Sequence, residues 1–288
     1  MVSVFDSQWW QEAVGRGVRS KAGMKYLLMP QLTPYLSLTT GRADITLATQ
    51  GLAYCYHQLP PGEEIPKGAE ENFTIGKRIT WRINDISDLD DVQSHFSTNK
   101  KRQIKKAADL IVSITFPSVP SSKNKSVLEP ISAITPEQFY DLHALWLSER
   151  GRRITYGREY FQHLAYAAFE HHSAAIISLR KSGKANELYA CAFLVFDEAT
   201  CYYLIPTFNP RYADSGAGAR LALESIRFAH EQGCRIFDFE GGNNSPSIAN
   251  HYKQFGTTPT EYFTLERYSN PLVKIAVSLY KRLSPKPQ

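Results

Sequence analysis

The chain has 288 residues, of which 43% are hydrophobic and 12% aromatic, and its formal net charge is +5. This length can hold one large domain or two ordinary ones, and the composition is typical of a folded globular protein. No run reaches the roughly 18 apolar residues that a membrane-spanning helix needs, and no secretory signal is evident. We therefore expect a cytoplasmic globular protein without a transmembrane segment.

The cysteine and histidine patterns argue against a metal site. Four cysteines are scattered, with no Cys-x-x-Cys pair and no metal-ligand spacing: Cys55, Cys191, Cys201 and Cys234. The adjacent His171 and His172 point apart and have no carboxylate partner in register. We expect reduced thiols that pack as small hydrophobic groups, and no metal.

The first part of the chain, residues 1–118, mixes short helices and strands. In chain order, the patterns predict a helix over 7–14 capped by Ser7, strands over 25–30 and 80–84, helices over 87–95 and 97–108, and a strand over 110–116. A segment rich in proline, serine and charge then follows at 117–126 and predicts a domain boundary.

The second part predicts a mixed α/β arrangement over 128–270, followed by a C-terminal helix and tail at 271–288. Thr135 and Pro136 are a strong helix start, and a second helix covers 159–170. Three antiparallel strands follow, over 174–180, 187–196 and 201–205. Apolar positions on the C-terminal helix leave three partners open, namely the body of the protein, a second subunit or a membrane surface.

The segment from Tyr202 to Tyr262 carries the most information about function. A glycine-bearing turn at 214–219 leads into a helix that stops near Gly233, and a strand over 235–240 ends at Gly241 and Gly242. A short helix and a last strand complete it. A turn that leads into a helix N-terminus can bind an anion, because free N–H groups and the helix dipole point toward it.

Two carboxylates lie at the end of the predicted strand over 235–240. Strand alternation places Asp238 and Glu240 on one face and Phe237 and Phe239 on the other. Such a pair can include a general base for an amine, provided that one pKa is raised. The alternative is structural, with one carboxylate capping the next helix or accepting bonds from the glycine turn.

Three local motifs resemble the GNAT acyltransferase fold, and residues 130–268 fit its element order. Phe237-Asp238-Phe239-Glu240-Gly241 resembles a "DFEGS" segment, and residues 250–256 resemble the "x-x-F-Y-K-x-F-G" segment that follows it. Residues 101–107 resemble an "R-R-N-I-R-K-A" helix. The likeness is to the FemAB-like, tandem-GNAT group, and it implies an α/β fold with a mixed sheet and two GNAT-like halves in tandem.

This resemblance implies an N-acyltransferase that moves an acyl group from acetyl-CoA or another acyl-CoA, or an aminoacyl group from aminoacyl-tRNA. The acceptor would be an amine on a small molecule or a cell-envelope precursor, and no metal is implied. The donor turn comprises Arg211, Ser215, Gly216, Ala217, Gly218 and Ala219. Ala213 stands where such enzymes carry Gln or Arg, so the glycines either bind a pyrophosphate or only permit a tight turn.

Further candidates come from the resemblance and from the charge pattern. Tyr252 lies where many GNAT enzymes have a tyrosine that protonates the leaving thiolate, although it could equally be a core residue. Lys253 could meet a donor phosphate or be solvated. Arg102 and Lys105 share one helix face and could bind an anionic substrate. A second hypothesis is a non-catalytic GNAT-like protein that binds a polyanion or a protein partner; the oligomeric state stays open.

Overall fold

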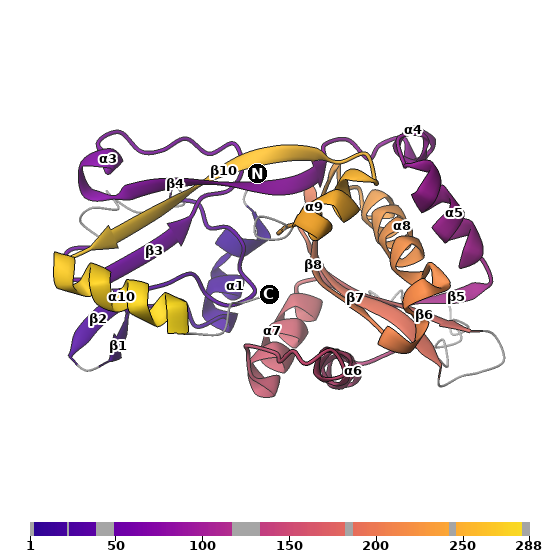
Figure 1. Cartoon of the computed structure of the whole chain (residues 1–288), viewed down its shortest axis with the longest axis horizontal. Coiled ribbons are helices and arrows are strands. Elements are labelled where there is room, and N and C mark those ends of the chain that lie inside the picture. The colour runs from indigo at the N-terminus through magenta and orange to yellow at the C-terminus, as the bar shows by residue number, and fades with distance from the viewer. Residues whose placement is uncertain are drawn as a thin grey trace. The chain divides into compact units, whose positions relative to one another are not determined.

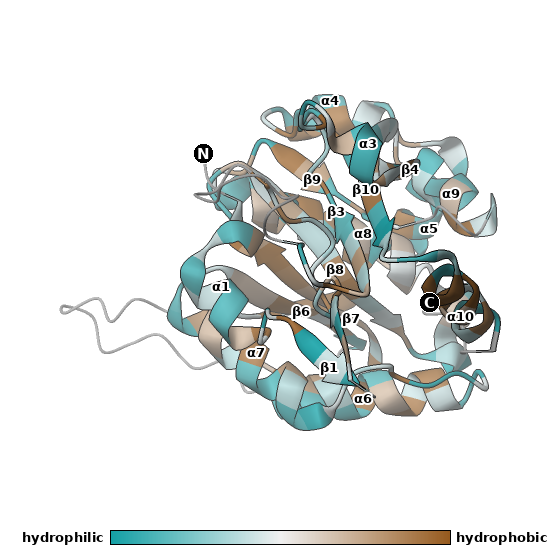
Figure 2. Cartoon of the chain, turned by 90° about the vertical axis from the view of Figure 1, so that its left-hand side faces the viewer, coloured by the Kyte–Doolittle hydropathy of each residue, from teal (hydrophilic) through white to brown (hydrophobic). Residues whose placement is uncertain are grey.

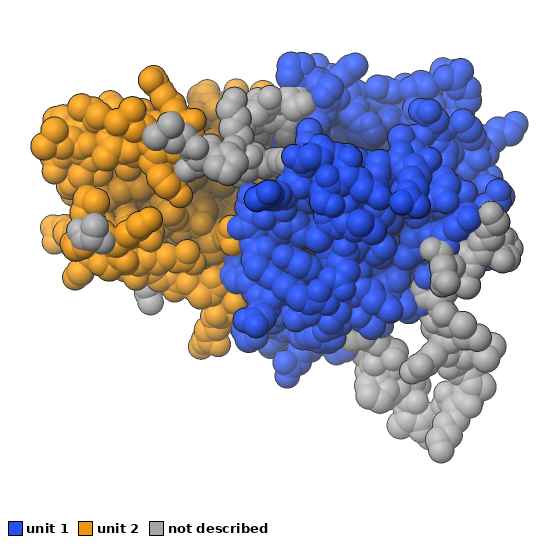
Figure 3. Space-filling model, turned by 60° about the horizontal axis from the view of Figure 1, so that its bottom comes forward, with its two compact units in different colours: residues 1, 3, 81–259 blue, residues 2, 4–80, 260–288 orange. Residues whose placement is uncertain are grey.

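A computed structural model describes residues 3–21, 23–38, 49–116, 133–181, 187–241 and 246–283. The chain forms two compact units, coloured separately in Figure 3. Unit 1 is built on Trp81–Pro259, and unit 2 combines Val4–Thr80 with Thr260–Gln288. The chain therefore passes between the units within two strands, β4 (Thr74–Ile83) and β10 (Thr258–Tyr268).

The predicted division into 1–118, 128–270 and 271–288 stays a prediction. The two compact units are defined by contacts between residues, whereas the predicted halves are defined by a repeated GNAT-like fold, so the units do not test the halves. The predicted linker at 117–126 lies outside the described residues.

Unit 1 contains a mixed sheet, which confirms the predicted α/β class. Its strands follow the order β4-β9-β8-β7-β6-β5. After β4 these are β9 (Ile236–Asp238), β8 (Thr200–Phe208), β7 (Leu188–Phe196), β6 (Ala174–Lys181) and β5 (Leu110–Thr115). Strands β5 to β8 pair antiparallel, whereas β8 and β9 run parallel.

Helices cover both faces of this sheet (Figure 1). Helix α8 (Ala217–Glu231) packs on one face with α5 (Thr98–Lys106) beside it, and Ile177 and Leu221 share the resulting core. Helices α6 (Pro136–Ser148) and α7 (Arg158–Glu170) pack on the other face, where the Phe193 ring lies 5.2 Å from that of Phe161. Because β6 and β7 are buried on both faces, their sequences are almost continuously apolar.

Local sequence explains where these helices begin and end. Thr135 and Gln138 form a capping box at the start of α6, with Pro136 in its first turn. Ser97 caps α5 through a bond from the Lys100 N–H, and the left-handed Gly233 follows the end of α8. These boundaries confirm the predicted helices.

The parallel strands β8 and β9 separate soon after they meet. They pair over Thr200–Tyr202 and Ile236–Asp238, after which β9 ends while β8 continues to Phe208. The chain leaves β9 through Glu240 and Gly241, whose φ angles are +53° and +52°. Residues that follow the strand end therefore lie where the two central strands part. Helix α9 (Pro246–Lys253) follows this turn in the chain. The same unit also contains the short helix α4 (Leu89–Ser94), which precedes α5.

Unit 2 has its own core. The strands follow the order β1-β2-β3-β10-β4, with β1 (Arg19–Lys21), β2 (Met24–Leu27) and β3 (Tyr54–Gln58). Leu59, Phe73 and Leu265 lie in a buried cluster of this unit. Its helices are α1 (Gln8–Ala13), the short α3 (Ala69–Asn72) and α10 (Pro271–Leu283). The sequence patterns did not predict β3 or α3, and they started β4 six residues late.

Candidate active site

A buried ion pair marks the end of β9. The Arg82 Nε donates to Asp238 Oδ2 over 2.7 Å, and these residues are direct partners in the β4–β9 ladder. Asp238 is fully buried, and the side chain of Arg82 is 10% exposed. Asp238 Oδ1 also accepts from the Glu240 N–H over 2.8 Å. Asp238 is therefore held in place from both sides, which is the structural alternative raised for one of the two carboxylates.

Glu240 has the opposite environment. Its Oε1 is buried and has no hydrogen-bond partner among the described residues. Burial, and then the Asp238 charge, hold the pKa of Glu240 well above the usual 4.5, although Arg82 opposes this. The left-handed backbone at a non-glycine residue adds strain, which tends to accumulate at functional sites. A carboxyl group with a raised pKa and a vacant acceptor is suited to take a proton.

The strand predicted over 235–240 is shorter in the structure. Strand β9 ends at Asp238, so the face of Glu240 is set by the turn and not by the pleat. The rings of Phe237 and Phe239 are 4.9 Å apart and both belong to the core. Asp238 and Glu240 nevertheless stay close enough for their charges to interact.

Tyr252 of α9 lies beside this carboxylate pair. Its ring centroid is 4.9 Å from that of Phe239, and burial together with the charges of Glu240 and Asp238 raises the pKa of its phenol. The phenol therefore stays protonated at neutral pH. Tyr203 of β8, whose hydroxyl is buried and has no partner among the described residues, completes the group. We refer to Arg82, Asp238, Tyr203, Glu240 and Tyr252 as the carboxylate cluster.

A buried lysine joins α5 to α9. Lys100 is 2% exposed; its Nζ lies 3.0 Å from His251 Nδ1 and 3.2 Å from Gln103 Oε1. Burial lowers the pKa of Lys100 to about 8. Burial, and then the Lys100 charge, lower the pKa of His251 to about 4, so the imidazole is neutral at pH 7 and accepts the bond. Lys100 also lies 4.9 Å from the Phe255 ring centroid.

The predicted donor turn packs directly on α5. A 3-10 helix (Pro210–Ser215) leads to Gly216, whose φ of +84° starts α8. A Cβ on Gly216 would lie 2.1 Å from the Gln103 carbonyl oxygen. Through Gln103, Lys100 and His251, a continuous set of contacts therefore connects the start of α8 to the carboxylate cluster within unit 1.

We expect Gly216→Ala to destabilise the chain by more than the strain of a left-handed alanine. The strain alone costs roughly 1 kcal/mol, and the contact with Gln103 would force α5 and α8 apart. Gly233→Ala is the matched control, because Gly233 has the same φ of +84° at the other end of α8 and no atom within 4 Å of the added Cβ. Chemical denaturation of both variants measures the difference, and equal losses would refute the close approach.

Several polar groups of this turn are already in use. The Ala217 N–H donates to Ser215 Oγ over 3.1 Å, the Ala219 N–H donates to the Gly216 carbonyl over 3.1 Å, and Ser215 Oγ donates to the Tyr212 carbonyl. Gly218 lies against Phe208, to which an added Cβ would come within 3.3 Å. Close packing against Gln103 and Phe208 therefore explains why both positions are glycine. The turn also leads directly into the N-terminus of α8.

The predicted basic residues lie in different surroundings. Arg211 pairs with Glu149 at 3.4 Å, and the exposed Lys253 lies over the Trp81 ring at 5.3 Å. Arg102 and Lys105 are exposed on α5, where Arg102 donates to Asn99. Lys106, which the sequence reasoning did not select, donates to the Asp214 carbonyl in the donor turn over 2.6 Å. It places a cation beside that turn.

Arg82 and Lys100 were also missed by the sequence reasoning. Arg82 had a weak signal, as a cation on an otherwise apolar stretch of strand. Lys100 had none, because it stands in a polar and basic run that is typical of a solvated helix face, Asn99-Lys100-Lys101-Arg102-Gln103. Burial distinguishes it from its neighbours.

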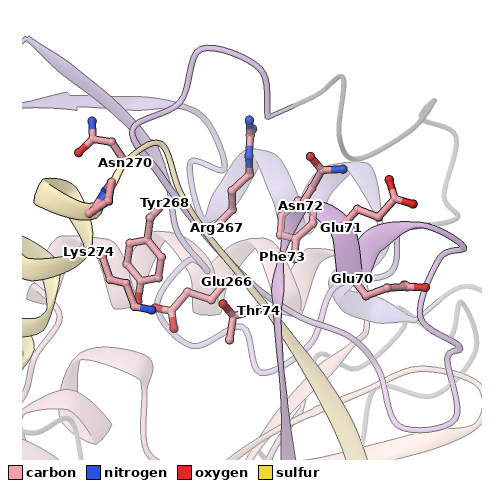
Figure 4. Close-up of a pocket in the computed structure, with 11 residues that line it drawn as sticks. Glu70, Glu71, Asn72, Phe73, Thr74, Glu266, Arg267, Tyr268, Asn270 and Lys274 are labelled. Carbon is pink, nitrogen blue, oxygen red and sulfur yellow. The ribbon is translucent and has the colours of Figure 1, made fainter.

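Potential metal ligands, cysteines and a pocket are other candidate sites in the described structure, and none of them brings the predicted site residues together. No group of three or more potential metal ligands occurs among the described residues. All four cysteines are buried, as predicted. A pocket of about 510 Å³ lies in unit 2, lined by α3, the end of β10 and the start of α10 (Figure 4). Glu70 and Glu71 line one side, and Glu266, Tyr268 and Lys274 another; the predicted site residues do not line it.

Comparison with known proteins supports the fold. FemX is 13% identical over 94% of both chains, with a TM-score of 0.62. The C-terminal domain of a putative lysylphosphatidylglycerol synthetase from Agrobacterium fabrum is 12% identical, covers 96% of this chain and 91% of that one, and has a TM-score of 0.59. L-PGS from Bacillus licheniformis is 12% identical over 94% and 85%, with a TM-score of 0.56. At these identities the likeness shows the fold alone.

The sequence comparison supplies the family. No curated protein matches the chain. The acetyltransferase (GNAT) domain model matches residues 94–254, which include α5, the start of α8, Asp238, Glu240 and Tyr252. No described helix is long and apolar enough to cross a membrane. The match covers more than half of the chain, so this protein belongs to the GNAT acetyltransferase family and is an acyltransferase with a FemAB-like fold.

Proposed function

We propose that the chain transfers an acyl group from an acyl-CoA thioester to a primary amine, with Glu240 as the general base. The observation that carries this proposal is the buried Glu240 Oε1, an acceptor for which the described residues supply no donor, where β8 and β9 part. A bound ammonium group would supply the donor and would stabilise the ionised carboxylate. The amine acceptor is thus matched to the group that must deprotonate it.

The proposed reaction uses three of the residues described. Glu240 takes a proton from the amine, whose nitrogen attacks the thioester carbonyl carbon. A C–N bond forms and the C–S bond breaks, and the thiolate takes the phenolic proton of Tyr252. The second proton of the former ammonium nitrogen passes through solvent to the Tyr252 phenolate. Asp238 acts as a positioning residue, because its carboxylate fixes the Glu240 N–H and pairs with Arg82.

The donor would lie at the start of α8. A helix N-terminus favours a phosphate through its dipole and its unbonded N–H groups, and Lys106 adds a positive charge there. Since the amides of Ala217 and Ala219 already have partners, we assign the phosphate contacts to the amides of Gly216 and Gly218. Arg211, two residues before Ala213, is the side chain proposed to replace the missing Gln or Arg.

A thermal-shift titration tests the donor first. We expect acetyl-CoA and longer acyl-CoAs to raise the melting temperature as their concentration increases. At a hundredfold excess over Kd, the bound donor should add about 2.7 kcal/mol to the free energy of unfolding. Free CoA serves as the comparison for the acyl group, and Lys106→Met should weaken the effect. Lys77→Met, on a lysine of unit 2 paired with Glu261, is the matched control. The absence of a shift with every CoA would remove this donor.

The exposed cations of α5 favour one second candidate, an aminoacyl-tRNA donor. Lys101, Arg102, Lys105 and Lys106 are exposed on α5, the helix that packs on the donor turn. A polyanion bound there would lose affinity steeply as salt increases, because each neutralised phosphate releases counterions. Salt-sensitive tRNA binding that Arg102→Gln and Lys105→Gln weaken, without any CoA shift, would favour this donor over acyl-CoA.

A further inference from the structure

The C-terminal helix α10 is amphipathic, but it is oriented with its apolar face outward. Leu272 is 77% exposed, Ile275 57% and Leu279 52%, although residues at this spacing share one helix face. Tyr280 beside them is 68% exposed. Four of the twelve exposed large apolar side chains in the described structure lie on this helix, so the patch is concentrated and not scattered. Figure 2 shows α10 as a strongly hydrophobic segment.

The side of α10 that faces unit 2 combines two valines with two lysines. Lys281 pairs with Glu266, and its Nζ lies 5.5 Å from the Tyr54 ring centroid. Lys274, one heptad earlier, lies 6.0 Å from the Tyr268 ring centroid. Val273 and Val277 are half-buried on the same side. These contacts fix the rotation of the helix, and they direct Leu272 and Leu279 away from the unit that carries them.

We propose that α10 docks unit 2 on the surface of a membrane that contains anionic lipid. Leu272, Ile275, Leu279 and Tyr280 would insert into the boundary between headgroups and acyl chains. Charge favours this occupant, because α10 has no carboxylate and keeps two exposed cations, Lys274 and Arg282, besides Lys281, which is already paired with Glu266. The helix would lie in the plane of the surface, between the bilayer and the rest of unit 2.

Size disfavours a second copy of the chain as the occupant. A helix of 13 residues is about 20 Å long and about 10 Å wide. Its outer face alone falls well short of the roughly 800 Å² per partner that a stable dimer buries. A lipid surface needs no such area, since burial of a few apolar side chains and attraction to anionic headgroups act together.

Vesicle sedimentation of the full chain tests this directly. We expect binding to vesicles of phosphatidylcholine with phosphatidylglycerol, weaker binding at higher salt, and little binding to phosphatidylcholine alone. Leu279→Ser should weaken binding about tenfold, because one buried leucine side chain contributes that much to an association. Leu272→Ser should have a similar effect, and Arg282→Gln should reduce the preference for the anionic lipid.

Leu145→Ser is the matched control, since Leu145 of α6 is 51% exposed, as Leu279 is 52% exposed, but lies in unit 1. It should leave vesicle binding unchanged, and unchanged melting temperatures for all variants would show that the chain still folds. Absence of binding to anionic vesicles, equal losses in Leu145→Ser and Leu279→Ser, or no loss in Leu279→Ser would each overturn the proposal. A dimer in sedimentation velocity that Leu272→Ser abolishes, with no vesicle binding, would assign the face to a second copy.

Discussion

Glu240→Gln should lower the rate of acyl transfer by about 10²- to 10⁴-fold while leaving donor binding intact, because removal of a general base has effects of this size. The amide keeps the shape of the carboxyl group but cannot take a proton. The assay is release of free thiol from an acyl-CoA in the presence of a panel of primary amines. Glu261→Gln is a matched control, because Glu261 is an exposed glutamate in unit 2.

The same variant has a second readout in stability. Since the pKa of Glu240 is higher in the folded chain than the usual 4.5, its contribution to stability is fully present below that pH and is lost as the pH rises through the folded-state value. Wild type should therefore lose stability relative to Glu240→Gln as the pH rises. A pH-independent difference between them would mean that Glu240 titrates normally, and an unchanged rate would remove it as the base.

Arg82→Met should cost about 3–5 kcal/mol of unfolding free energy, because it leaves a buried aspartate without its cation. Asp238 is 0% exposed and accepts from Arg82 Nε over 2.7 Å. Arg82 also lowers the pKa of Glu240, so its loss should raise that pKa further and move the acidic limb of the rate profile to higher pH. Urea denaturation and the pH–rate profile measure the two effects.

Arg235→Met provides the comparison for this prediction. Arg235 pairs with Asp85 at 3.2 Å, but both side chains are more than half exposed, and exposed pairs contribute roughly 0–1 kcal/mol. The double variant Arg82→Met with Asp238→Asn should recover part of the loss, since the buried charge is then removed as well. A loss in Arg82→Met no larger than that in Arg235→Met would contradict the buried-pair interpretation.

The sequence predicted the elements of unit 1 better than those of unit 2. Around α6 and α8, apolar spacing, caps and a terminal glycine agree, so their boundaries were close to those observed. Strand β3 was missed because Tyr54–Gln58 combines tyrosines with a buried histidine and has no clear alternation. Its ladder partner β10 is more than 200 residues away, and pairing over that separation leaves no local signal.

The sequence identified several residues of the site, but it did not predict their burial or their interaction partners. The motif resemblance selected Asp238, Glu240 and Tyr252, and the structure places them together. The division of roles between the two carboxylates depends on Arg82, which lies more than 150 residues earlier and reaches Asp238 only through the β4–β9 ladder. The exposure difference between Lys100 and Lys101 likewise follows from how α9 packs on α5, which a run of like charges does not reveal.

Hydrogen–deuterium exchange with and without acetyl-CoA tests the central claim most directly, namely that the donor lies at the start of α8 beside the carboxylate cluster. We expect acetyl-CoA to slow amide exchange in the 3-10 helix Pro210–Ser215, in the first turn of α8 and in the packed helix α5. This pattern should persist in Glu240→Gln, which retains the donor site. Two results would contradict this donor site. One is slowed exchange only around the unit 2 pocket that includes Glu266 and Lys274, and the other is unchanged exchange in Pro210–Ser215, α8 and α5 at saturating acetyl-CoA.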